Sequence, residues 1–128
     1  MPKYVDSPLA PPNVPLNWAV TAPVGEIFYA AHLSIGPNGT FVNGTIEEQT
    51  RQTMENIKGS IQAAGGTMAD IAQCLVYLTD ASEADGMNRA YGEYFKQPYP
   101  NRATVVVSAL LIPEAKVEIV ACAHLAGQ

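Results

Sequence analysis

Some segments of this chain have the apolar pattern of strands and others have the apolar pattern of helices, with a period of about 3.6 residues. The places where one pattern gives way to the other predict the secondary-structure elements. Glu26–Leu33 is rich in bulky and aromatic residues, which predicts a strand, and the turn residues at 36–39 close it. The capping box Thr45-Ile46-Glu47-Glu48 then opens a helix. Its apolar stripe is formed by Ile46, Met54, Ile57 and Ile61. Two consecutive glycines at 65–66 end this helix.

The second half of the chain repeats the change from strand to helix. Residues 71–79 read as a mostly apolar strand. A second capping box at 82–85 predicts a helix that runs to Pro98, and two more strands are expected at 103–110 and 117–125. This order of elements predicts an α+β domain, a sheet with two helices packed on one face.

Two charged residues interrupt the last two apolar strands. Arg102 stands at the start of one and Glu118 in the other. A buried charge needs a partner, so either the two neutralise each other as a structural pair, or each faces a pocket where a bound anion completes the arginine. If the strands form a simple hairpin, the two residues lie roughly 23 Å apart. A cleft that used both charges would then need two subunits.

Composition narrows the class of protein. Only 15% of the 128 residues are charged and the net charge is −5, which opposes a nucleic-acid partner. So few charges on a small single domain, residues 1–128, favour an oligomer. We expect no membrane partner and a cytoplasmic location, because no apolar run is long enough for a membrane span and no signal peptide is recognisable.

The cysteines and histidines offer no recognisable reactive centre. Cys74 and Cys122 are isolated in apolar strands, and His32 and His124 lack the paired spacing of metal ligands. We therefore expect core thiols and no metal site.

A longer pattern spans almost the whole chain. It consists of Pro100, Arg102 and an apolar strand, Pro113 in a short loop, Val117-Glu118-Ile119, and the segments 49–57, 63–65, 70–80, Asn88 and 91–95. In this pattern the chain resembles the RidA/YjgF/UK114 family of reactive-intermediate deaminases.

The resemblance implies a fold, an assembly and an activity. The fold is chorismate-mutase-like, with a mixed sheet of about six strands, and three copies form a homotrimer around a central barrel with ligand clefts between subunits. Neither a metal nor an organic cofactor is implied. Arg102 would grip the carboxylate of a small enamine or imine acid such as 2-aminoacrylate. Glu118 would hold the water that hydrolyses it to a 2-keto acid and ammonia.

The chain departs from the family around the ligand. Trp18 replaces a tyrosine, Ala31 and His32 stand where the family has serine and glycine, and Thr104 replaces cysteine or serine. We expect these residues to contact substrate and to alter substrate choice while the reaction is kept, although packing roles for Trp18, His32 and Thr104 stay open. The alternative function is a protein that binds a keto acid or another small carboxylate through Arg102 without turnover.

Overall fold

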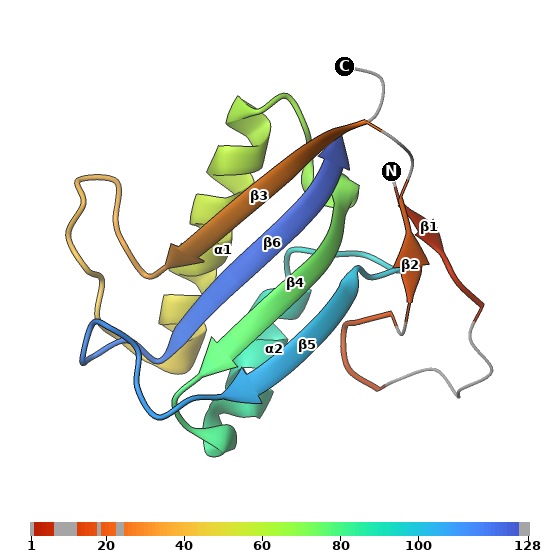
Figure 1. Cartoon of the computed structure of the whole chain (residues 1–128). Coiled ribbons are helices and arrows are strands. Elements are labelled where there is room, and N and C mark those ends of the chain that lie inside the picture. The colour runs from red at the N-terminus through yellow and green to blue at the C-terminus, as the bar shows by residue number, and fades with distance from the viewer. Residues whose placement is uncertain (1, 7–12, 18, 23–24, 126–128) are drawn as a thin grey trace.

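The computed structural model describes residues 2–6, 13–17, 19–22 and 25–125, which form a sheet with two helices on one face (Figure 1). The sheet has the order β3-β6-β4-β5. Its strands are β3 (Glu26–Leu33), β4 (Ile71–Leu78), β5 (Asn101–Val106) and β6 (Val117–Leu125), and the helices are α1 (Ile46–Ala63) and α2 (Ala84–Gly92). The predicted α+β class is therefore confirmed.

The sheet is smaller than the expected six strands. Strands β1 (Lys3–Tyr4) and β2 (Val20–Thr21) pair only with each other, as a separate two-stranded ribbon. The short return at 40–42 contributes only an isolated bridge between Ile35 and Phe41. In the described part of the chain, no helix is long and apolar enough to cross a bilayer.

The first helix begins at its predicted capping box. The Glu48 amide donates to Thr45 Oγ1 at 3.2 Å, and the Thr45 amide donates to Glu48 Oε1 at 3.0 Å, so two otherwise unpaired N–H groups are satisfied. The predicted apolar stripe is buried against the sheet.

The second helix differs from its prediction at both ends. The Ser82 hydroxyl donates to Asp80 Oδ1 at 2.7 Å, and the Ser82 amide donates to the same oxygen at 2.9 Å. Asp80 therefore caps a 3₁₀ turn, Ala81–Glu83, and α2 starts only after it. It ends at Gly92, well before Pro98.

The expected hairpin between the last two strands is wrong. Strand β5 runs parallel to its neighbour β4 and forms a further isolated bridge from Asn101 to Asn17, while β6 lies between β3 and β4 and is antiparallel to both. Residues 107–116 carry the chain past β4 from one side to the other. The residues of an apolar strand do not specify which strand it pairs with, so the sequence pattern could not distinguish this crossover from a hairpin.

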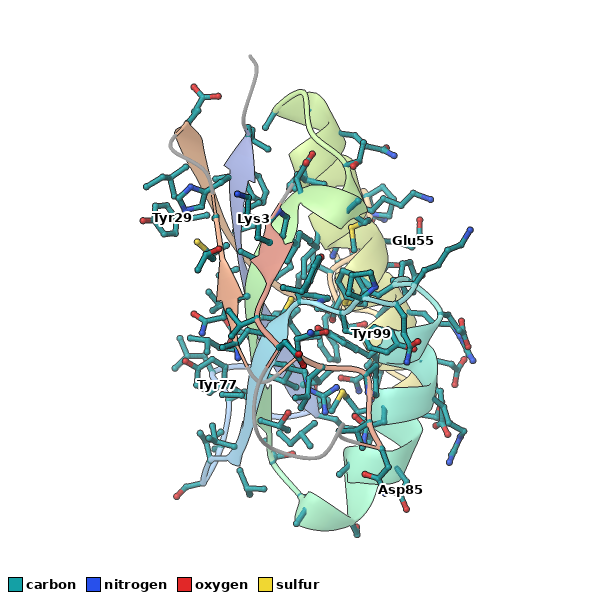
Figure 2. All side chains as sticks on the ribbon, turned by 90° about the vertical axis from the view of Figure 1, so that its right-hand side faces the viewer. Lys3, Tyr29, Glu55, Tyr77, Asp85 and Tyr99 are labelled. Atoms are coloured by element: carbon teal, nitrogen blue, oxygen red, sulfur yellow. The ribbon has the colours of Figure 1, made fainter. Side chains whose placement is uncertain are left out.

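The two faces of the sheet have different surroundings. The alternate residues of β6 that start at Val117 are buried under the helices, whereas those that start at Glu118 face the other side and are half-buried. We call this second side the open face. Figure 2 shows Tyr29 and Tyr77 projecting from it, away from the helices. Tyr29 is 71% exposed, so the open face leaves apolar surface for a further partner.

Close contact between the helices gives a test of the packing. A Cβ on Gly86 would lie 2.6 Å from Ile46 Cγ2, whereas a Cβ on Gly59 would meet nothing within 4 Å. Gly86→Ala should lower the free energy of unfolding by about 1–2 kcal/mol. Gly59→Ala, the control in an exposed turn of α1, should raise it by about 0.5–1 kcal/mol. Urea denaturation measures both, and a stable Gly86→Ala protein would contradict this packing.

Candidate functional site

Arg102 is the second residue of the edge strand β5. Its backbone lies beside Cys74 of β4, so its side chain points to the helix-covered face. There the guanidinium carbon lies 4.9 Å from the centre of the Tyr91 ring of α2, which is a cation–π distance. The residue is only 8% exposed. Strand register and helix packing together hold this charge at the edge of the core.

The described residues do not satisfy the guanidinium of Arg102 completely. Its Nε and Nη1 atoms are buried, and neither has a hydrogen-bond partner in the described structure. Burial lowers the pKa of Arg102, yet an arginine does not lose its proton in a protein. A buried cation with two unpaired N–H groups is costly unless an anion completes it.

The groups beside the guanidinium do not neutralise it. Burial raises the pKa of the Cys74 thiol to about 11, and burial also raises the pKa of Tyr91 well above its usual value. Both side chains are therefore neutral at pH 7. An uncharged thiol is also a poor nucleophile, so Cys74 is suited to packing rather than to covalent chemistry.

Glu118 lies on the opposite side of the sheet from Arg102. Its neighbours in register are Leu33 of β3 and Tyr77 of β4, and all three face the open side. Arg102 and Glu118 are separated by three residues along β4 and by two strand spacings. These offsets place their Cα atoms roughly 14 Å apart, with the side chains on opposite faces. The structural pair considered from the sequence does not form within one chain.

The other predicted substrate contacts divide between the two edges of the sheet. Thr104 is exposed and shares the face of Arg102 on β5. Ala31 and His32 belong to β3, the opposite edge strand. Ala31 points to the open face, as Glu118 does, whereas His32 Nε2 lies 2.8 Å from Ser60 Oγ of α1. Burial lowers the pKa of His32.

Trp18 lies outside the described residues, but the residue before it is anchored next to Arg102. The Asn17 amide donates to the Pro100 carbonyl at 3.0 Å, and Asn101 Nδ2 donates to the Asn17 carbonyl at 3.0 Å. Within one chain, Arg102, Thr104 and Asn17, the residue before Trp18, therefore lie at the same edge of the sheet. The same chain keeps Ala31, His32 and Glu118 apart from them.

The structure adds one polar group that the sequence pattern left as packing. Asn88 Oδ1 is buried without a hydrogen-bond partner in the described structure, and Asn88 stands one turn before Tyr91 on α2. A buried acceptor without a donor is uncommon in a folded protein. The three-residue spacing of Asn88 and Tyr91, which puts them on one side of a helix, was the only signal in the sequence.

Comparison with known proteins identifies the family to which the chain belongs. Residues 9–125 match the model of the family described as Endoribonuclease L-PSP. A RutC family protein from Pyrococcus horikoshii is 42% identical over 85 residues, which cover 66% of this chain and 68% of that protein. The chain belongs to the RidA/YjgF/UK114 family.

Solved structures of RidA/YjgF/UK114 proteins share the fold. A Rid family protein of unknown function from Yersinia pestis has a TM-score of 0.87 at 24% identity, and the match covers 97% of this chain and 98% of that one. RidA from an Antarctic Psychrobacter has a TM-score of 0.74 at 31% identity, with 93% and 94% covered. The four-stranded sheet with its two helices is thus the fold of the RidA/YjgF/UK114 family.

The unsatisfied guanidinium predicts an unusual stability effect. Arg102→Met removes a buried charge and keeps an unbranched side chain, so the free energy of unfolding should stay the same or rise by up to about 2 kcal/mol. A structurally paired arginine would instead cost about 3–5 kcal/mol when removed. Thermal and urea denaturation measure the change. Arg89→Met, which removes an exposed ion pair with Glu47, is the control and should change little.

Proposed function

We propose that this protein hydrolyses small enamine and imine carboxylic acids to 2-keto acids and ammonia. The observation that carries the proposal is the buried guanidinium of Arg102 with two unpaired N–H groups. A planar guanidinium matches a carboxylate in bidentate geometry, and the anion would supply the charge that the protein lacks here. A small α-imino or α-enamino acid carries such a carboxylate next to its reactive carbon.

The proposed active cleft lies between two copies of the chain. Arg102 and Thr104 of one subunit would face Ala31 and Glu118 of the next, since a single chain keeps these pairs on different strands and on opposite faces of the sheet. The exposed apolar residues of the open face favour such an association. A ring of three subunits with one repeated heterologous interface would form three equivalent clefts.

Within that cleft the chemistry needs only a water and a proton carrier. An enamine first takes a proton on carbon and loses one from nitrogen to solvent, which gives the imine. Glu118 would accept a proton from water as the oxygen attacks the imine carbon, and would then deliver that proton to nitrogen. The product of this addition carries a hydroxyl and an amino group on one carbon. The hydroxyl proton then passes through Glu118 to the amino nitrogen as the carbon–nitrogen bond breaks, so that ammonia leaves and the carbonyl of the 2-keto acid remains. An imine carbon is already electrophilic, so no side-chain nucleophile is needed.

The residues that differ from the family's usual pattern would set substrate choice. Thr104 stands on the same face as Arg102, two residues further along β5, where its hydroxyl could hydrogen-bond a substrate. Trp18 would supply an aromatic surface without a phenol. We propose that the reaction is kept while the accepted side chain differs.

An RNA substrate fits this chain poorly, although the family model is described as an endoribonuclease. The net charge is −5, and three basic residues, Arg51, Arg89 and Lys116, lie in ion pairs with glutamates. An RNA backbone requires clustered and available cations.

Turnover separates the enzyme from a protein that only binds carboxylates. With 2-aminoacrylate generated in situ, the protein should accelerate its conversion to pyruvate and ammonia. Arg102→Lys and Arg102→Ala should each lower kcat/KM by about 100-fold, because an ammonium group cannot make two parallel hydrogen bonds to one carboxylate. Near-normal turnover by the lysine variant would remove Arg102 from the site.

Replacing the proposed water-holding carboxylate should separate binding from catalysis. Glu118→Gln should lower kcat by about 10²–10⁴-fold while calorimetry shows a Kd for pyruvate within a few-fold of wild type, because an amide keeps the shape but accepts no proton. Glu114→Gln in the exposed loop before β6 is the control and should keep full activity. Equal losses of binding and rate would show that Glu118 does not act on water.

Mixed assemblies test whether two chains share one cleft. Arg102→Ala and Glu118→Gln proteins, each inactive alone, should regain activity when they are unfolded together and refolded. With equal amounts and random assembly, about a quarter of the clefts would combine both intact residues. Activity should approach that fraction of wild type. Inactive but verified mixed oligomers would mean that the two charges do not meet across an interface.

A further inference from the structure

Helix α1 carries a row of polar residues beside its apolar stripe. Gln49, Thr53, Asn56 and Ser60 follow one another at spacings of three or four and therefore share a side of the helix. Three of them use their side chains to reach other segments, at the end of β3 or just before β6. The end of β3 lies beside Glu118 in the sheet, and the segment before β6 precedes Glu118 along the chain.

Gln49 of α1 hydrogen-bonds the backbone segment that leads into β6. Its side chain is fully buried, and its Oε1 accepts a hydrogen bond from the Lys116 amide at 2.9 Å. Its Nε2 donates to the Glu114 carbonyl at 3.1 Å and to the Gly44 carbonyl at 3.3 Å. One carboxamide thus holds the backbone on both sides of residue 115, three residues before Glu118.

Asn56 fixes the strand beside Glu118. Its Nδ2 donates to the Leu33 carbonyl at 3.0 Å and to the Ile35 carbonyl at 2.8 Å. Leu33 lies directly opposite Glu118 in the β3–β6 register. The backbone before Glu118 and the backbone beside it are therefore both anchored to one helix.

We propose that Gln49 and Asn56 are positioning residues that set where the Glu118 carboxylate lies. The inference rests on the proposed deaminase function and adds two residues that never touch the substrate. A helix of 18 residues, capped at its start and packed on the sheet, is a rigid reference. The Gln49 amide donates to and accepts from the backbone before Glu118, and Asn56 donates two hydrogen bonds to the backbone beside it. An apolar side chain of the same size could make neither set of bonds.

The primary test compares two buried residues of α1. Gln49→Met keeps volume but removes every polar contact, so kcat should fall about 10- to 100-fold while KM stays within about twofold, because Arg102 still binds the carboxylate. Thr53→Val is the control. Among the described residues, its Oγ1 donates to the Gln49 carbonyl of the same helix, at 2.8 Å, and to no other segment, so this variant should keep its kcat even where its melting temperature falls.

A conservative variant adds a pH readout. In Gln49→Glu the introduced carboxyl, when protonated, offers an acceptor and one donor, so it can accept from the Lys116 amide and donate to one of the two carbonyls that the amide bonds. Burial raises the pKa of such a group. Relative to wild type at the same pH, kcat of Gln49→Glu should therefore recover as the pH falls, whereas Gln49→Met should show no recovery. Asn56→Asp loses both donors and should lower kcat with little change in KM, which gives a second test if Gln49→Met does not fold.

The outcomes distinguish this inference from the proposed function. If wild-type protein does not accelerate 2-aminoacrylate loss, the deaminase proposal fails. If wild type is active and folded Gln49→Met and Asn56→Asp proteins keep wild-type kcat, the positioning role is wrong while the deaminase stands. A loss of kcat in Thr53→Val that matches Gln49→Met at equal stability would also overturn it, because helix integrity alone would then explain the effect.

Discussion

Strand β6 pairs along its length with β3 on one side and with β4 on the other, and it decides which side chains can meet. Every second residue from Val117 to Leu125 is buried beneath the helices. The residues between them, Glu118 among these, must face the open side. Since the neighbouring strands follow the same alternation, the register of β6 assigns a face to Arg102, Thr104, Ala31 and His32.

Because Arg102 and Glu118 lie on opposite faces of the sheet, Glu118 cannot pair with Arg102 of the same chain. The guanidinium lies over the Tyr91 ring, and two of its buried nitrogens have no hydrogen-bond partner in the described structure. Its neighbours Cys74 and Tyr91 are neutral and do not balance its charge. A fold selected only for stability would do better with an apolar side chain at this place. The proposed ligand carboxylate would supply the anion that this guanidinium lacks.

Helix α1 connects stability to the proposed chemistry. Its apolar stripe builds the core, and the adjacent polar row, Gln49 with Asn56 and Ser60, reaches the ends of the strands. Both sets stood in the sequence at helical spacing, but only the apolar set has a general meaning there. The positioning role proposed for a buried glutamine can be recognised only when the backbone groups that it hydrogen-bonds are known.

The sequence by itself determined the local elements whose causes are local. Strand β3, the capping box at Thr45 and strand β6 appear where the residues predict them, because side-chain alternation and cap hydrogen bonds act over a few residues. It also marked Arg102 and Glu118 as charges in apolar strands. Only the tertiary structure decided that β5 and β6 flank β4 instead of pairing, and hence that the two charges lie on opposite faces. Strand order depends on long-range contacts among apolar residues that are interchangeable in the sequence, and this is why the sequence pattern could not determine it.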